Sequence, residues 1–409
     1  MITEKDRQRL RALAGEQAER AAGDLNARIY ADWMAHGAGS PGSRPMIRIE
    51  LNTFEPEVIP ALQKCEGDEA RAIERRLLAA TVNQALFGDD TLVPAYYGVA
   101  NRMRFMAFGL PVKREHTGGL GHQFVPYLTD LRRDYGLLRP SIYGGDPEGA
   151  AREAERAHSL FGDLLPVRRI SNAMGVSPTQ DVVHIMSMED MYVAMMDEPE
   201  LFVRMLDRLA DDYLAFFRQL ADEGQLISAA RDQHLCQGTY CFTDELPDMK
   251  PGAQLADLWL YADSQESAGI GASMYEELVF PAYKKLAAAF GLISYGCCEA
   301  VHALWDRCLS TLSNLRKVSI SPWCDEEMMG ERLRGGPVVY LRKPSPNYLG
   351  VGDALDEDGV REHIARTARA ARGCRLEVIQ RDVYTIGHST EKVRRYVALI
   401  REQLDKYWR

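Results

Sequence analysis

Two adjacent cysteines followed by a glutamate, Cys297-Cys298-Glu299, are the residues of this sequence whose types and spacing most suggest chemistry. They follow the apolar run GLISYGC at 291–297, which is typical of a buried strand. Zinc accepts thiolate and carboxylate ligands, so Cys297 and Glu299 are candidate zinc ligands. Adjacent strand residues point to opposite faces, which favours Cys297, on the face of Tyr295, as the metal-binding thiol. No CxxC or HExxH pattern supports a standard zinc motif, so spacing alone leaves metal binding open.

Other polar residues stand where predicted strands end. Arg342 and Lys343 follow the apolar run PVVYL and can clamp an anionic group, although they can equally be charges in solvent. Glu266 and Asp382 are candidate catalytic groups because a carboxyl group can donate or accept a proton. The candidates for contact with substrate are Tyr240, Gln265, Tyr295, Trp323 and His388.

Strand and helix patterns alternate at least five times in the second half of the chain. A helix is predicted at 197–224, followed by a short strand at 225–230. Further strands are predicted at 256–263, 291–297, 315–321, 337–343 and 375–381, each followed by a helix, and an early strand at 46–51. Parallel strands need helical crossovers, so the pattern predicts an α/β fold and, with this many units, a closed (β/α)8 TIM barrel. In such barrels the chemistry lies at the carboxyl ends of the strands.

We expect two regions along the chain. Residues 1–100 form an N-terminal helical extension with the first strand elements, and residues 101–409 form the barrel. The N-terminal region could cap the mouth of the barrel or build a subunit interface.

Composition and charge exclude several classes of protein. The 409 residues are 46% hydrophobic and 26% charged, with a formal net charge of −10, which disfavours a general nucleic-acid binder. No apolar run is long enough for a membrane span, and the first residues contain no apolar signal-peptide core. Eight scattered cysteines do not form a disulfide pattern, so a cytoplasmic location is predicted. The absence of GxxxxGK[ST], GxGxxG and GxSxG motifs argues against nucleotide and serine-hydrolase chemistry.

Several segments resemble a known superfamily. CFTDELP (241–247), ADSQES (262–267) and SYGCCEAVH (294–302), with VVYLRKPSP and LEVIQRDVYTIG further on, are similar to a poorly characterised branch of the uroporphyrinogen decarboxylase superfamily. The resemblance covers residue 162 to the C-terminus and implies a (β/α)8 barrel that pairs as a homodimer. That branch is related to zinc-dependent corrinoid methyltransferases.

The resemblance implies two chemistries. Decarboxylation of porphyrinogens needs an arginine-rich loop that is not found here. The other chemistry is zinc-dependent methyl transfer between a corrinoid protein and a thiol or tetrahydrofolate-type acceptor. A His-x-Cys pair of those methyltransferases matches Tyr295-Gly296-Cys297, which keeps the cysteine, and their further cysteine ligand falls near Asp382.

We therefore expect a metal-dependent methyltransferase-like enzyme, with zinc and a corrinoid as cofactors. Its expected partners are a small-molecule substrate and a corrinoid protein. Two alternatives stay open. One is a cofactor-free decarboxylase or lyase acting on an anionic small molecule, with Asp382 or Glu266 as proton donor and Arg342 and Lys343 as the clamp. The other is a non-catalytic barrel subunit.

Overall fold

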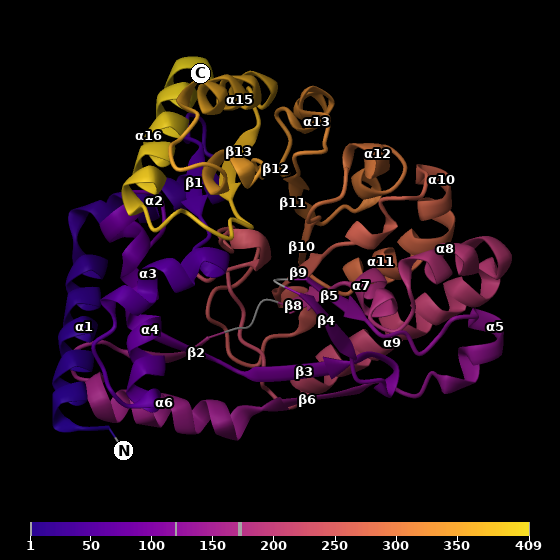
Figure 1. Ribbon diagram of the computed structural model, residues 1–409, viewed down its shortest axis with the longest axis horizontal. Coiled ribbons are helices and arrows are strands. Elements are labelled where there is room, and N and C mark those ends of the chain that lie inside the picture. Colours follow the sequence, from indigo (N-terminus) through magenta and orange to yellow (C-terminus); the bar gives the residue numbers. More distant parts are fainter. Residues whose placement is uncertain (1, 119–120, 171–173, 409) are drawn as a thin grey trace.

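A seven-stranded parallel sheet forms the centre of the protein, whose computed structural model describes residues 2–118, 121–170 and 174–408 (Figure 1). Its strands in chain order are β1 (Met46–Ile49), β8 (Met174–Val176), β9 (Trp259–Ala262), β10 (Leu292–Tyr295), β11 (Leu315–Ile320), β12 (Val339–Arg342) and β13 (Arg375–Gln380). The predicted α/β class and parallel sheet are thus confirmed, and six of the predicted strands lie within two or three residues of their expected bounds.

The order of the strands is that of an opened ring. The strands β8 to β13 lie side by side in chain order, and β1, the first strand, pairs in parallel with β13, the last, with Met46 opposite Glu377. Within the described residues, no hydrogen-bonded strand joins β8 to β1, so a closed eight-stranded barrel is not observed. The irregular segment 232–241 lies in this gap: a Cβ on Gly175 of β8 would lie 3.7 Å from Cys236 Sγ, and Arg48 of β1 donates to the Gly238 carbonyl.

The predicted strand at 225–230 is wrong. Ile227 makes only an isolated antiparallel bridge to Pro251, and Ser228 exchanges backbone hydrogen bonds with Lys250 and Met249. The apolar run is buried because its side chains pack into the core, Ala229 against Trp259 and Leu292, and not because it pairs in the sheet. A short buried run therefore gave the same signal as a strand.

Helices cover the outer side of the sheet, as crossovers between parallel strands require (Figure 1). The longest is α9 (Pro199–Asp222), which matches the helix predicted at 197–224 and buries apolar residues at helical spacing, including Phe202, Leu206, Leu209 and Phe217. The others on this side are α11 (Phe280–Ala287), α13 (Glu326–Leu333), α15 (Glu357–Ala370) and α16 (Thr390–Tyr407). The Ser389 side chain caps α16 by accepting from the Lys392 backbone N–H.

The described residues up to 170 add a helical layer and three small sheets. The helix α1 (Glu4–Ala22) packs against α4 (Asp68–Val82) and α6 (Pro147–Phe161). The paired strands are β2 (Tyr97–Ala100) with β7 (Val167–Ile170), β3 (Arg102–Met106) with β6 (Ile142–Asp146), and β4 (Arg114–Gly118) with β5 (Gly121–Phe124). Since β1 belongs to the central sheet, residues 1–100 share that sheet with the C-terminal strand, and the division at residue 100 stays a prediction.

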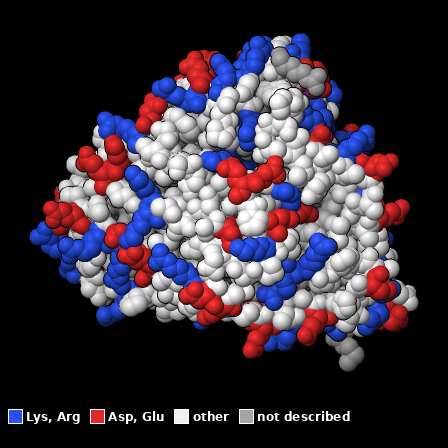
Figure 2. Space-filling model, turned by 180° about the vertical axis from the view of Figure 1, so that it is seen from behind, with Lys and Arg blue, Asp and Glu red and all other residues white. Residues whose placement is uncertain are grey.

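Further α-helices in the described part of the chain are α2 (Asp24–Ala38), α3 (Glu55–Leu62), α5 (Leu131–Asp134), α7 (Pro178–Val183), α8 (Met188–Asp197), α10 (Ala272–Met274), α12 (His302–Trp305) and α14 (Asn347–Gly350). In the described part of the chain, no helix combines the length and apolar character needed to cross a membrane. Basic and acidic side chains are interspersed over the face seen in Figure 2, which shows no large region of one sign.

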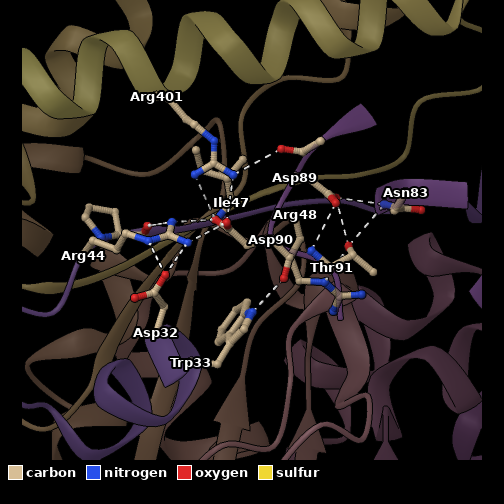
Figure 3. Close-up of polar contacts among 12 residues, drawn as sticks. Asp32, Trp33, Arg44, Ile47, Arg48, Asn83, Asp89, Asp90, Thr91 and Arg401 are labelled. Carbon is tan, nitrogen blue, oxygen red and sulfur yellow. Dashed lines mark hydrogen bonds and ion pairs between the residues drawn. The ribbon is translucent and has the colours of Figure 1, made fainter. Parts of the chain in front are cut away.

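Two buried carboxylates fix the position of β1 (Figure 3). Asp90 accepts hydrogen bonds from Arg44, from Arg401 of α16 and from the Ile47 backbone N–H. Its neighbour Asp89 accepts from the Ile49 N–H at 2.7 Å. Alternate residues of β1 are thus tied on one side by Asp89 and Asp90, while the residue between them, Arg48, is left to face the interior of the sheet.

Candidate functional site

The vicinal thiols lie where β10 ends. The strand stops at Tyr295, and Gly296 adopts a φ of +100° in which a Cβ would lie 3.1 Å from Val301 Cγ1 and 3.2 Å from Ser319 Cβ. This position therefore requires glycine. Because the strand has ended, Cys297 and Cys298 do not alternate across the sheet, and their sulfur atoms lie 3.7 Å apart. Both thiols can serve one site, unlike the expectation from strand geometry.

The two thiols differ in acidity. The thiol of Cys297 donates to Cys298, and this hydrogen bond, helped by Lys343 and Arg381, lowers the pKa of Cys298 to about 7. The same hydrogen bond, together with burial, raises the pKa of Cys297. Cys298 is exposed and Cys297 is buried. The pair thus presents one accessible thiolate at neutral pH, supported by a protonated neighbour.

Two cations lie against the thiols, from the ends of β12 and β13, the second and third strands beyond β10. Lys343 follows β12 and is buried; its Nζ donates to Gln237 Oε1 and lies 3.4 Å from the Gly296 carbonyl. Arg381 follows β13 and also donates to Gln237 Oε1, with an N–H 3.7 Å from Cys297 Sγ. Burial and the nearby Arg381 lower the pKa of Lys343 to about 8. We call Cys297, Cys298, Lys343 and Arg381 the thiol–cation cluster.

A neutral carboxamide sits between the two cations. Gln237 belongs to the segment that fills the gap in the sheet, and its φ of +69° is rare for a residue other than glycine. Its Nε2 donates to the Tyr261 hydroxyl at 2.7 Å, and that hydroxyl donates to Asp263 Oδ2 at 2.9 Å. The other oxygen, Asp263 Oδ1, is buried with no hydrogen-bond partner among the described residues.

The predicted metal ligand Glu299 is occupied by the backbone. Its two carboxylate oxygens accept from the Ser264 N–H at 3.0 Å and the Cys297 N–H at 2.8 Å, which ties the loops after β9 and β10 together. Burial and the nearby Asp263 raise the pKa of Glu299 to about 7. Among the described residues, no three His, Cys, Asp or Glu side chains gather as a metal site would require. The residues present therefore offer a zinc ion two thiols but no third ligand of this kind.

The predicted clamp of Arg342 and Lys343 is not formed. Arg342 is on the opposite face of β12, where it donates to Glu326 at 2.9 Å and to the carbonyls of Ile320 and Ser321. Consecutive strand residues point to opposite faces, so Arg342 packs beneath the outer helices while Lys343 faces the interior. Arg381, which the sequence did not single out, takes the second position beside Lys343.

Three other candidates are also buried away from the thiols. The Tyr295 hydroxyl lies on the helix side, 2.5 Å from Ser264 Oγ and 2.6 Å from the Tyr275 hydroxyl. Glu266 accepts from Thr179 at 2.8 Å, and burial raises its pKa. The Tyr240 hydroxyl accepts from the Leu92 N–H at 2.9 Å, deeper in the sheet.

The remaining candidates lie nearer the surface. Asp382 forms an ion pair of 3.2 Å with Arg381 and so belongs next to the cluster. Gln265 is half-buried after β9, whereas Trp323 is 74% exposed and His388 is exposed. Of the predicted residues, the structure thus gathers Cys297, Lys343 and Asp382, and it adds Cys298, Arg381, Gln237 and Asp263.

A comparison with solved structures finds a protein that is similar over nearly the whole chain. A methyltransferase from Methanosarcina mazei superposes with a TM-score of 0.51 over 91% of this chain and 98% of its own, at 13% sequence identity. No protein-family model matches the sequence, and no curated protein sequence matches it either. The likeness shows a shared fold that extends over nearly all of both chains, and membership of the uroporphyrinogen decarboxylase superfamily stays a prediction.

Proposed function

We propose that this protein is a methyltransferase-like enzyme that moves a methyl group between a corrinoid, free or protein-bound, and a small anionic acceptor at the thiol–cation cluster. The observation that carries the proposal is the exposed Cys298 thiol, with its lowered pKa, beside two interior cations at the carboxyl ends of parallel strands. The fold shared with the methyltransferase from Methanosarcina mazei supports it, as does the position of the site at the carboxyl ends of the strands of a parallel sheet.

The cations and the thiolate of the cluster have separate roles in the proposed methyl transfer. Lys343 and Arg381 bind the anionic group of the acceptor, for example a carboxylate or sulfonate, in place of Gln237. The Cys298 thiolate takes the proton of the acceptor nucleophile, such as a thiol, as that nucleophile attacks the methyl carbon. A bond forms between the nucleophile and the methyl carbon, and the bond from the methyl carbon to the donor breaks with its electron pair left on the donor.

A zinc-dependent form of the proposal would hold the ion at Cys297 and Cys298. Zinc there would lower the pKa of an acceptor thiol and so supply a thiolate at neutral pH. The steps above do not pass through a metal, because the described residues provide only two thiols and Glu299 is held by backbone N–H groups.

The test is methyl transfer from methylcobalamin to 2-mercaptoethanesulfonate or 3-mercaptopropionate, followed by absorbance and by mass spectrometry of the thioether. Neutral 2-mercaptoethanol has the same nucleophile without the anionic group and should react more slowly. Cys298→Ser should lower the rate by about 10² or more, the range for loss of a general base. Cys324→Ser is the matched control, since Cys324 follows the neighbouring strand β11 and contacts Ser321 and the Glu299 carbonyl instead of the cluster. Equal rates in both variants would rule out the assigned role of Cys298.

The lyase alternative keeps one supporting observation. Glu266 is a buried carboxyl group with a raised pKa, which suits a proton donor. The lyase alternative would be favoured if an anionic substrate released CO₂ in a Glu266-dependent reaction while no methyl transfer occurred.

The homodimer stays a prediction.

A further inference from the structure

A cavity of about 790 Å³ lies beside the open edge of the sheet, between β1, β2 and the segment 232–240. Its volume is in the range of small-molecule sites. Apolar side chains form much of its wall: Ile49, Leu51, Leu92, Pro94 and Ile170. The cavity does not include the thiols, Lys343 or Arg381, from which Gln237 and Glu50 separate it.

The guanidinium of Arg48 lines this cavity and is 5% exposed. It lies over the ring of Tyr240, 3.9 Å from the centroid. Its polar partners are all neutral: Nε is 3.3 Å from Thr91 Oγ1, one terminal nitrogen donates to the Gly238 carbonyl, and the other is 3.3 Å from His234 Nδ1. A guanidinium has five N–H donors, so these contacts leave two for a ligand.

Two other buried cations in strands of the central sheet have a carboxylate partner. Lys317 pairs with Glu377 at 2.7 Å, and Arg342 pairs with Glu326 at 2.9 Å. In the described part of the chain, Arg48 forms no ion pair. Asp89 interacts with Arg48 electrostatically without forming a direct ion pair, so the buried guanidinium keeps N–H donors that an anionic ligand can bind.

The two carboxylates that bind the backbone of β1 on either side of Arg48 already have other partners. Asp89 accepts from the Ile49 N–H and from Asn83 and Thr91, and burial raises its pKa. Figure 3 shows the guanidinium groups of Arg44 and Arg401 converging on Asp90, whereas that of Arg48 points away from it.

We propose that Arg48 binds the carboxylate of a small amphipathic molecule whose apolar body fills this cavity. A planar guanidinium with two free N–H donors suits a single carboxylate. The cavity is also lined by Glu50 and Asp232, which disfavour ligands with several negative charges, such as a phosphate monoester. Arg48 is not among the residues assigned to methyl transfer, although Gln237, which contacts Lys343 and Arg381, also lines this cavity.

Benzoate and hexanoate are suitable probes, and benzamide is the neutral control with the same ring. Ligand-observed NMR and calorimetry on the full chain should show saturable binding of at least one carboxylate with a Kd of about 1 mM or tighter, and none of benzamide. Arg48→Gln should weaken this binding at least tenfold. The matched control is Arg76→Gln: Arg76 lines the same cavity but is paired with Glu153.

Unchanged carboxylate binding in Arg48→Gln, equal binding of benzamide, or no saturable binding of either carboxylate to the wild-type chain would overturn the proposal. Arg48→Lys covers the case in which Arg48→Gln does not fold. It keeps the charge but loses the two-pronged geometry, so binding should weaken several-fold and remain measurable.

Discussion

Replacing Gln237 by glutamate should place a negative charge between Lys343 and Arg381, where the wild-type protein has a neutral carboxamide. Gln237 Oε1 accepts hydrogen bonds from both Lys343 and Arg381, and this carboxamide oxygen carries no formal negative charge. Glutamate has nearly the same shape, so Gln237→Glu places a carboxylate oxygen between the two cations. We expect the folded state to become more stable at pH 7 and the affinity of the cluster for external anions to fall.

The size of the effect follows from the contacts. Two hydrogen bonds from cations to a neutral oxygen would become bonds to a carboxylate, whose contribution is larger by about 1 kcal/mol each. Against this, the Nε2 donor to the Tyr261 hydroxyl is lost, and the new charge lies near Asp263, beyond Tyr261. A lost hydrogen bond costs about 1 kcal/mol, so the net gain expected is about 1 kcal/mol.

The dependence on pH is the more specific sign. In the wild-type chain the pKa of Lys343 is lowered from 10.5 to about 8, so between these values the unfolded chain binds more protons at this residue than the folded one. Stability from this lysine therefore rises as pH increases from about 8 to 10.5, by about 3 kcal/mol in all. The carboxylate in Gln237→Glu should raise the pKa of Lys343 towards 10.5 and remove most of this rise.

The assay is urea denaturation of both proteins at pH 7 and at pH 10. The variant should be the more stable at pH 7, and the difference should shrink or reverse at pH 10, where Lys343 of the wild-type chain has lost its proton. Gln265→Glu is the matched control, because it adds the same charge at a half-buried position after β9. A stability difference between Gln237→Glu and wild type that is equal at the two pH values would refute the reasoning about Lys343.

Four further outcomes follow from the geometry. Arg342→Met should lower the free energy of unfolding by about 3–5 kcal/mol in urea denaturation, because Glu326 would stay buried with only the more distant Arg366, at 3.7 Å, as a cationic partner. Alkylation of Cys298 by iodoacetamide should have its midpoint near pH 7, and Cys297→Ala should move that midpoint towards 9 by removing the hydrogen bond that stabilises the thiolate. Gly296→Ala should destabilise the protein by more than about 1 kcal/mol, since φ is +100° and the added Cβ meets Val301 at 3.1 Å. In elemental analysis, a zinc-dependent enzyme would carry about one zinc per chain that Cys297→Ala loses, whereas the metal-free mechanism expects none in either protein.

The regular part of the fold could be predicted from sequence because local pattern and tertiary role agree there. The helix α9 buries an unbroken apolar stripe, and β10 to β13 are short apolar runs between helical crossovers. The failure at 225–230 has the opposite cause. That run is equally apolar, but its backbone bonds go to a turn at 249–251, and no local signal distinguishes that partner from a strand.

The site was harder to predict because it depends on where strands end and which way side chains point. If β10 continued through Cys298, the side chains of Cys297 and Cys298 would point to opposite faces of the sheet. The strand ends at Tyr295, directly before Gly296, and both thiols can therefore lie together. The same alternation separates Arg342 from Lys343, which look like a pair in sequence. Gln237 carries no signal at all, since a glutamine with positive φ in an irregular segment is set by its tertiary contacts.

Charge pairing separates two kinds of buried cation in this fold. Lys317 and Arg342 have carboxylate partners, so their charges are balanced within the fold. Lys343 and Arg48 are buried to a similar degree. Among the described residues, their hydrogen-bond partners are neutral oxygens and, for Arg48, a ring nitrogen of His234. The consecutive residues Gln237 and Gly238 supply an oxygen to each of them. A buried charge without an ion-pair partner is unfavourable, so we expect anionic ligands to stabilise the protein at these two positions. The segment that carries Gln237 and Gly238 lies between them.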